Sequence, residues 1–291
     1  MRVLVVGAGL MGAQIGCEYA LGGHEVTLVS RDETAAGDRA SAGLATLERL
    51  GLSTAGELDA ARGRLAVAAK PEPDGWDLVV ESLPEDLELK VELLRPLADA
   101  SPEAIVATNT SSLSVGELGE RLGADGRTLG THYWNPPLLM PLVEVVIAEE
   151  TSPAVLDRVV DTLRALGKRP VVCRDVPGFV WNRLQTAVLR EAVWLCEQGV
   201  ATPETVDEVL TQGLARRWRH VGFFSAVALG GVATWEQAAR NLLPKISAAT
   251  ELEGIARWTP QGENVLAEAA ERRDRGLARD LSEERKSDVE R

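Results

Sequence analysis

His132 and Glu144 are the two residues whose types and spacing best suit acid–base chemistry. His132 is one of only three histidines and lies in the stretch THYWNPP at 131–137, and Glu144 follows twelve positions later in the apolar run LVEVV at 142–146. A carboxylate inside an apolar strand needs a partner, because burying an unpaired charge is costly. An imidazole held by such a carboxylate is a general base near neutral pH. Beside a redox cofactor, this pair would define a dehydrogenase.

A glycine-rich turn near the N-terminus predicts that cofactor. The residues GAGLMG at 7–12 form the pattern G-x-G-x-x-G between an expected strand and an expected helix, and this context makes the pattern specific for a dinucleotide. Gly7 permits the tight turn, Gly9 lets the backbone approach the diphosphate, and Gly12 allows close packing of the helix on the strand. The diphosphate would meet the helix N-terminus, whose N–H groups favour an anion. The turn residues expected at the cofactor are Gly7, Gly9, Leu10, Met11 and Gly12.

The end of the second expected strand bears on the form of the cofactor. An acid at this place would accept a hydrogen bond from the 2′-hydroxyl of the adenosine ribose and select NAD. Ser30 occupies the place instead, and Arg31 follows it. A small polar residue beside a guanidinium suits a 2′-phosphate, so the sequence favours NADP. Two alternatives keep NAD open: Arg31 stacks on the adenine, or Asp32 reaches back to the ribose.

The hydrophobic pattern indicates how the chain positions these residues. Up to residue 174, short apolar runs alternate with helical patterns, which indicates a Rossmann-type, mainly parallel, doubly wound α/β sheet. After the turn DVPG at 175–178 the strand signals stop. We therefore expect a NAD(P)-binding Rossmann domain at 1–176 and an all-α C-terminal domain at 177–291, whose charge-rich end from Glu271 reads as a solvated tail. The expected strands are 2–6, 25–30, 65–68, 77–81, 104–108, 128–133, 142–148 and 170–174, and the expected helices are 10–21, 33–62, 85–98, 115–122, 153–166, 179–198, 203–212, 233–247 and 263–281.

The composition argues against several classes of function. The net charge is −13 at pH 7, which disfavours binding of nucleic acid or of an anionic membrane. Cys17, Cys173 and Cys196 show no spacing typical of a metal site or a disulfide framework, so we expect no metal and a cytoplasmic location. The apolar run at 3–6 is too short for a signal peptide, and no apolar run reaches membrane-spanning length.

Further motifs, in order along the chain, resemble those of the L-3-hydroxyacyl-CoA dehydrogenase family. They are VESLPEDLELK at 80–90, TNTSSL at 108–113, the stretch around His132, and PGFVWNR at 177–183. The resemblance runs from Gly7 to about Gly231. The block at 84–90 and the helix between 178 and 199 are most similar to the branch that holds lambda-crystallin/L-gulonate dehydrogenase and carnitine dehydrogenase. The resemblance implies an NAD(P)-dependent dehydrogenase that acts on a CH–OH group.

The resemblance also implies roles for individual residues. His132 would be the catalytic base and Glu144 the carboxylate that orients it, while Ser111 and Asn182 would hydrogen-bond the substrate oxygen and the acyl portion. Oxidation of a secondary alcohol then sends the hydride to NAD(P) and the proton to the imidazole, with Ser111 donating to the developing oxyanion. The other residues implied are Glu85, Lys90 and Asn109 on the cofactor side and Asn135 on the substrate side.

In this family the helical domain also forms a homodimer. The expected helix at 179–198 carries Trp181, Val188 and Trp194, so it is apolar enough to serve as that interface.

The chain departs from the family pattern in two places. The acyl-CoA enzymes carry basic residues after the second strand that meet CoA, whereas the cations here between 33 and 69 are four arginines and no lysine. The stretch GFFSAVALGG at 222–231 replaces the usual Gly-Pro and acidic residue. We therefore expect a small-molecule L-3-hydroxy acid or its thioester as substrate, and leave open a CoA thioester, a carrier-protein thioester or a free acid.

A different class of function also fits the fold. A non-catalytic nucleotide-binding protein, or a crystallin-like structural protein, could use the same architecture. The set of Ser111, His132, Glu144 and Asn182 is complete in this chain, which favours catalysis.

Overall fold

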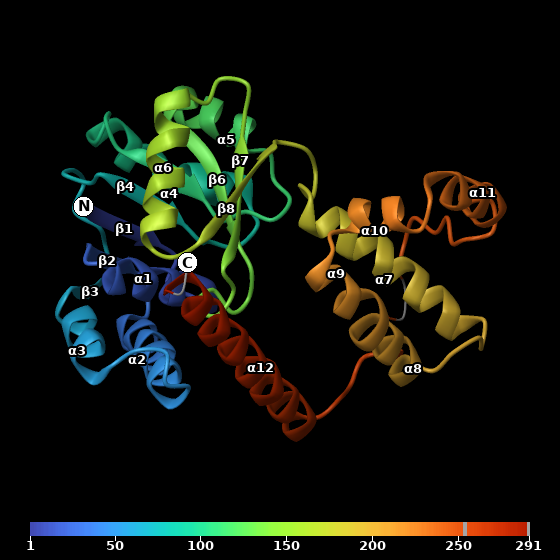
Figure 1. The fold of residues 1–291 in the computed structure, drawn as a ribbon. Coiled ribbons are helices and arrows are strands. Elements are labelled where there is room, and N and C mark those ends of the chain that lie inside the picture. Colours follow the sequence, from blue (N-terminus) through green and yellow to red (C-terminus); the bar gives the residue numbers. More distant parts are fainter. Residues whose placement is uncertain (253–254, 290–291) are drawn as a thin grey trace. The chain divides into compact units, whose positions relative to one another are not determined.

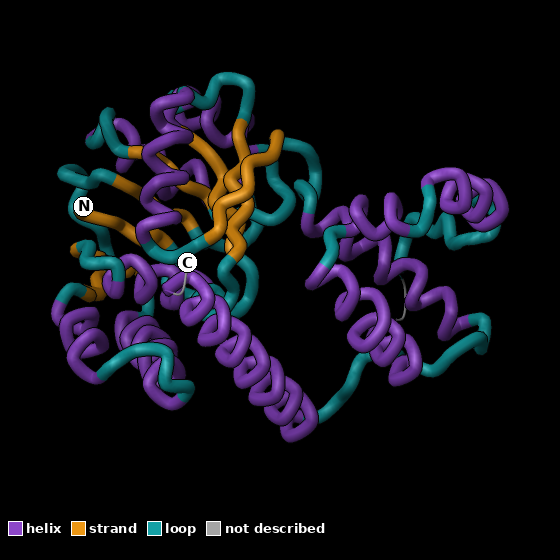
Figure 2. The backbone as a smooth tube through the Cα atoms, in the orientation of Figure 1, coloured by secondary structure: helices purple, strands orange, loops and turns teal. Residues whose placement is uncertain are grey.

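The computed structural model describes residues 1–252 and 255–289, which form two units. The first unit comprises Met1–Val180 together with the C-terminal segment from Ala270, and the second comprises Trp181–Ala269. The strands lie in the first unit, whereas the second, over its described residues, consists of helices and loops (Figures 1 and 2). This confirms the predicted fold class, a doubly wound α/β unit with an α-helical one.

An eight-stranded sheet forms the centre of the first unit. Its order is β3-β2-β1-β4-β5-β6-β7-β8, so the chain winds outward from β1 in both directions. Neighbouring strands are parallel except β6 and β7, which are antiparallel. The strands are β1 (Arg2–Val6), β2 (Glu25–Val29), β3 (Leu65–Ala68), β4 (Leu78–Glu81), β5 (Ile105–Thr108), β6 (Thr128–Tyr133), β7 (Leu142–Ile147) and β8 (Arg169–Arg174).

Helices cover both faces of this sheet, because successive residues of a strand point to opposite sides. In β1, Val3 and Val5 pack into one apolar core, and Leu4 and Val6 pack into the other. Burial on both faces explains why such strands appear in the sequence as continuous apolar runs. Helices α1 (Leu10–Leu21), α2 (Glu33–Arg49), α3 (Ala55–Gly63) and α6 (Pro153–Ala165) pack on the first core, and α4 (Leu87–Ala100) and α5 (Val115–Leu122) pack on the second.

The long helical region expected at roughly 33–62 is divided into two helices, α2 and α3. Gly51 adopts a left-handed backbone with a φ of 67° between them, a conformation that favours glycine. Thr54 then begins α3 with a capping box, in which it exchanges side-chain to backbone hydrogen bonds with Glu57. These stop and start signals are present in the sequence, but the apolar periodicity runs across them.

The last helix, α12 (Glu263–Val289), also differs from expectation. Its residues 270–289 belong to the first unit rather than to a solvated tail of the expected 177–291 domain, whereas 263–269 belong to the second unit (Figure 1). Glu271 pairs with Arg49 of α2 at 2.7 Å. The apolar side chains that contact the core are Leu277, Ala278 and Leu281. Because most residues in this stretch are charged, the short apolar stripe was not recognised in the sequence.

The second unit is built from short helices. The sequence predicted its first helix, whereas α9 and α10 were not expected. Its helices are α7 (Trp181–Glu197), α8 (Pro203–Glu208), a π-helical stretch at Val209–Ala215, α9 (Arg216–His220), α10 (Phe223–Leu229) and α11 (Val232–Leu242). Among the residues that the structure describes, no helix combines the length and hydropathy that a membrane span requires.

Candidate active site

A cavity of about 970 Å³ follows the carboxyl ends of the strands in the first unit. Open α/β sheets bind their ligands at this edge. The predicted site residues that line the cavity are Gly7, Gly9, Leu10, Met11, Ser30, Arg31, Glu85, Asn109, Ser111 and His132. Residues from widely separated motifs thus share one cavity.

The glycine-rich turn is shaped to let a ligand approach its backbone. Gly7 has a φ of 99°, and a Cβ there would meet the backbone of Ser82. A Cβ on Gly12 would overlap the carbonyl oxygen of Gly7, so close packing requires a glycine. A Cβ on Gly9 would meet no protein atom within 4 Å, and Gly9 begins α1 without a side-chain cap. The turn therefore fits a dinucleotide diphosphate at the helix N-terminus.

The sheet register brings His132 and Glu144 together. They are direct partners across the antiparallel pair β6–β7, and His132 Nδ1 lies 2.7 Å from Glu144 Oε2. Both side chains are buried, with exposures of 7% and 1%. An ionised carboxylate only accepts hydrogen bonds, so a neutral imidazole paired with one carries its proton on Nδ1 and keeps the lone pair on Nε2. Since His132 lines the cavity, the arrangement can accept a proton from a ligand there.

Glu144 is held in place by the segment that follows β8. The backbone N–H of Val180 donates to Glu144 Oε1 at 3.0 Å, and the ring of Phe179 packs edge-on against His132 with 5.6 Å between centroids. Phe179 has a φ of 48°, in the left-handed region, where a non-glycine residue costs about 1–3 kcal/mol. The stretch PGFV at 177–180 therefore shapes the surroundings of the histidine. The motif was evident in the sequence, but these contacts were not.

Glu85 organises the loop that carries Ser111. Its Oε1 atom accepts hydrogen bonds from Thr110 Oγ1 at 2.7 Å, from the Ser111 N–H at 2.8 Å and from the Ser112 N–H at 2.9 Å. Partial burial by itself would raise the pKa of Glu85, but these hydrogen bonds and the charge of Lys90 lower the pKa to about 2. Glu85 is therefore a carboxylate at neutral pH, and it holds the loop through charge-assisted hydrogen bonds.

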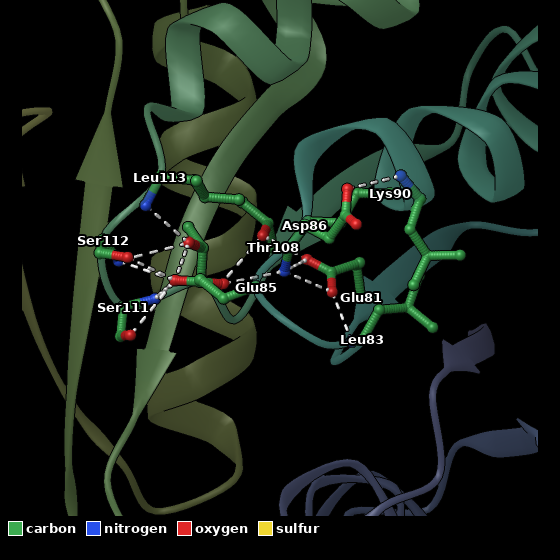
Figure 3. A network of polar contacts seen from close by, with 11 residues as sticks. Glu81, Leu83, Glu85, Asp86, Lys90, Thr108, Ser111, Ser112 and Leu113 are labelled. Atoms are coloured by element: carbon green, nitrogen blue, oxygen red, sulfur yellow. Dashed lines mark hydrogen bonds and ion pairs between the residues drawn. The ribbon is translucent and has the colours of Figure 1, made fainter.

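Behind Glu85 lies a buried ion pair, drawn with its neighbours in Figure 3. Lys90 Nζ is 2.7 Å and 2.8 Å from the two carboxylate oxygens of Glu81 and 3.2 Å from Glu85 Oε2. Lys90 and Glu81 are 1% and 0% exposed. Thr108 Oγ1 and the Leu83 N–H also donate to Glu81. Glu81 was missed at the sequence level, although its position at the end of an apolar strand could have indicated a partnered charge.

Three residues expected at the cofactor or substrate lie elsewhere in the first unit. Lys90 is absent from the cavity wall and reaches it only through Glu85. Gly12 packs under the turn without lining the cavity, which agrees with the packing role predicted for it. Asn135 is exposed, beyond the end of β6, and does not line the cavity. Asn182 belongs to the first turn of α7, in the second unit.

Asn109 has a structural contact as well as a place on the cavity wall. Its Oδ1 atom accepts a hydrogen bond from the backbone N–H of Tyr133 at 2.8 Å. It therefore ties the end of β5 to the residue after His132.

The contacts of Asp32 bear on one of the two NAD alternatives, the one in which its carboxylate reaches back to the ribose. The Asp32 carboxylate accepts a hydrogen bond from the Ala35 N–H at 2.9 Å and so caps α2. It is engaged at the helix start rather than reaching back to the ribose position. Ser30 and Arg31 line the cavity, as do Arg39 and Lys70, which the sequence-level interpretation did not include.

Comparison with protein families gives two matches that together cover most of the chain. Residues 2–176 match 3-hydroxyacyl-CoA dehydrogenase, NAD binding domain, and residues 178–259 match 3-hydroxyacyl-CoA dehydrogenase, C-terminal domain. The order agrees with the motifs, and the description of the first match supports NAD as the cofactor.

Individual relatives are also named as dehydrogenases. The chain is 31% identical over 253 residues to 5-formyl-3-hydroxy-2-methylpyridine 4-carboxylate 5-dehydrogenase of Mesorhizobium japonicum, covering 84% of this chain and 81% of the relative. It is 36% identical over 223 residues to mitochondrial hydroxyacyl-coenzyme A dehydrogenase of Sus scrofa, covering 73% and 71%. It is 38% identical over 185 residues to L-carnitine dehydrogenase of Burkholderia mallei, covering 63% and 56%. These names confirm the predicted family and its carnitine dehydrogenase branch, and give no support to a non-catalytic protein.

A solved structure matches nearly the whole chain. The crystal structure of 5-formyl-3-hydroxy-2-methylpyridine 4-carboxylic acid 5-dehydrogenase, described as an NAD+ dependent dismutase, has a TM-score of 0.83 and 28% sequence identity. The match covers 95% of this chain and 96% of the other. The similarity therefore covers most of both units.

Proposed function

Because the chain belongs to the 3-hydroxyacyl-CoA dehydrogenase family, we propose that it interconverts an L-3-hydroxyacyl compound and its 3-keto form with NAD(P). The observation that carries the proposal is the 2.7 Å contact between His132 Nδ1 and Glu144 on the wall of the cavity that also holds the glycine-rich turn. A bound nicotinamide accepts or donates the hydride in such a site. The protein's own groups then handle the proton and the charge on oxygen.

Each residue has a distinct task in this proposal. His132 Nε2 takes the hydroxyl proton during oxidation and returns it during reduction, while Glu144 stabilises the imidazolium and fixes its orientation. Ser111, whose hydroxyl donates to Glu85 Oε1 at 3.2 Å in the structure, is proposed to turn that donor to the oxygen that develops negative charge. Asn182 is proposed to hydrogen-bond the acyl portion, and Asn135 to support the substrate side.

The residues also bear on whether the substrate is a CoA thioester, a carrier-protein thioester or a free acid. The absence of lysine between 33 and 69 weakens the case for a CoA thioester, because the acyl-CoA enzymes of the family carry basic residues there. A free 3-hydroxy acid and a carrier-protein thioester are the competing forms. The relative that acts on a pyridine carboxylate and the one that acts on carnitine support a small free acid.

For the cofactor, we propose NADP in preference to NAD. Ser30 stands where an acid would accept from a ribose 2′-hydroxyl, and the neighbouring Arg31 lines the same cavity. Asp32, which could have replaced the missing acid, caps α2. A guanidinium beside a small polar residue suits a 2′-phosphate.

A turnover panel tests both proposals in one experiment. NAD and NADP are each assayed against 3-hydroxyacyl-CoAs, carnitine, L-gulonate and simple 3-hydroxy acids, and kcat/KM is compared across all pairs. We expect turnover with a 3-hydroxy compound and a higher kcat/KM with NADP. A preference of tenfold or more for NAD would remove the cofactor proposal, and an absence of turnover across the panel would remove the activity.

We also propose that the helical unit forms a homodimer. Its surface exposes large apolar side chains, among them Leu184 at 64%, Phe224 at 84% and Leu229 at 80%, and apolar exposure on this scale marks an interaction surface. Sedimentation equilibrium should give twice the chain mass of 31.2 kDa. Leu184→Glu and Phe224→Glu should shift the equilibrium toward monomer. A monomeric mass for the unaltered protein at tens of micromolar would contradict the dimer.

A further inference from the structure

We propose that Lys70 and Arg39 join Arg31 to form a three-cation site for the 2′-phosphate of NADP around Ser30. The inference rests on the proposed dinucleotide-dependent function and adds two residues, Arg39 nine positions and Lys70 forty positions after Ser30. All four residues line the same cavity. A phosphate monoester carries a charge of about −1.5 to −2 near pH 7, which three cations can match.

The register of the sheet brings Lys70 beside Arg31. Strands β2 and β3 are parallel and pair Val29 with Ala68, and the Ser30 N–H donates to the Ala68 carbonyl at 3.1 Å. Ser30 and Arg31 directly follow β2, and Ala69 and Lys70 directly follow β3, so the two cations leave the ends of neighbouring strands. Neighbouring strands are about 4.8 Å apart, so both side chains can reach one phosphate.

Arg39 approaches the same part of the cavity from α2. Its Nη1 atom donates to the carbonyl oxygen of Ala8 at 3.4 Å, which sets the guanidinium beside the glycine-rich turn. Arg39 therefore reaches the cavity from a helix, whereas Arg31 and Lys70 reach it from strand ends. Three cations from separate segments, Arg31, Arg39 and Lys70, thus line the cavity together with Ser30, which stands where an acid would select NAD.

The local charge is opposite in sign to that of the whole chain. The net charge is −13, yet across the described residues no carboxylate lies within 4 Å of Arg31, Arg39 or Lys70. Glu85 is the one carboxylate among the described residues of the cavity wall, and it follows β4, two strands from β2, or about 10 Å away at ordinary strand spacing. Unneutralised cations in an acidic protein favour an anionic ligand.

Binding of adenosine nucleotides tests the site without relying on turnover. Isothermal titration calorimetry compares 2′,5′-ADP, which carries the 2′-phosphate, with 5′-AMP, which lacks it. We expect the unaltered protein to bind 2′,5′-ADP at least about tenfold more tightly than 5′-AMP, as charge-assisted hydrogen bonds would give. Lys70→Ala and Arg39→Ala should each weaken 2′,5′-ADP by about tenfold and change 5′-AMP by less than about twofold.

Arg62→Ala is the matched control, since Arg62 is an exposed cation paired with Asp59 on α3 and lies off the cavity. It should leave both affinities unchanged. Equal affinities of the unaltered protein for the two nucleotides would overturn the inference, and so would equal losses in the control and in the two variants. Turnover with NAD alongside such a result would leave the proposed dehydrogenase function intact, whereas no binding of either nucleotide would overturn both.

Discussion

Replacing His132 by alanine is expected to lower kcat by at least about 100-fold, the range usual for loss of a general base, and to leave cofactor affinity nearly unchanged. The reason is that His132 Nδ1 is held by Glu144, so only Nε2 can exchange a proton with a ligand in the cavity. The residues expected to bind the cofactor, in the glycine-rich turn and at Ser30, do not include His132, so its loss should not weaken cofactor binding. Steady-state kinetics and fluorescence titration of the reduced cofactor measure the two quantities.

A second variant separates catalysis from folding. His132→Ala removes the partner of a buried carboxylate, whereas His132→Asn keeps an N–H near the position of Nδ1 that can donate to Glu144 and cannot act as the base. Both variants should lose turnover, and the asparagine variant should keep its unfolding temperature closer to that of the unaltered protein. His24→Ala is the control, since His24 lies off the cavity. Turnover retained in a folded His132 variant would take the histidine out of its proposed role.

Lys90→Met is expected to be among the most destabilising substitutions in the chain. Glu81 is fully buried and Lys90 is the cation that neutralises it, with both carboxylate oxygens within 2.8 Å. Breaking a buried pair by removing one partner costs about 3–5 kcal/mol, because the other charge is left uncompensated. Urea denaturation should show this as a lower midpoint with an unchanged slope.

Arg121→Met gives the matched comparison for Lys90→Met. Arg121 pairs with Glu88 at 2.7 Å, the same distance as the buried pair, but both side chains are exposed. An exposed pair contributes only about 0–1 kcal/mol. A loss of stability in Lys90→Met no greater than in Arg121→Met would show that burial does not set the strength of the Glu81–Lys90 pair.

Most of the sheet could be predicted from the sequence, because buried parallel strands have a distinctive pattern. Each of the eight strands was expected within a residue or so of its observed position. The α2–α3 break was missed because the apolar period of the two helices runs on through Gly51, although a left-handed glycine ends the first helix. The place of α12 rests on tertiary contacts, those of Leu277, Ala278 and Leu281 with the core and of Glu271 with Arg49, which local sequence does not encode.

The site residues that belong to short sequence motifs could be predicted. The sequence could not show which of their side chains reach the cavity surface and which lie buried behind it. Lys90 and Glu85 stand five positions apart in one motif, yet Glu85 lines the cavity and Lys90 is 1% exposed behind it. Lys70 and Arg39 were missed for a related reason, since only the pairing of β2 with β3 and the packing of α2 bring them to the cavity that Ser30 lines.

The segment that holds Glu144 has a practical consequence for dissecting the molecule. The matched family regions divide between residues 176 and 178, which would be the natural place to cut the chain or to join halves of two relatives. A cut there would discard the Phe179 ring and the Val180 amide, which contact His132 and Glu144. A fragment or chimera meant to keep the acid–base pair intact should therefore carry its junction beyond Val180.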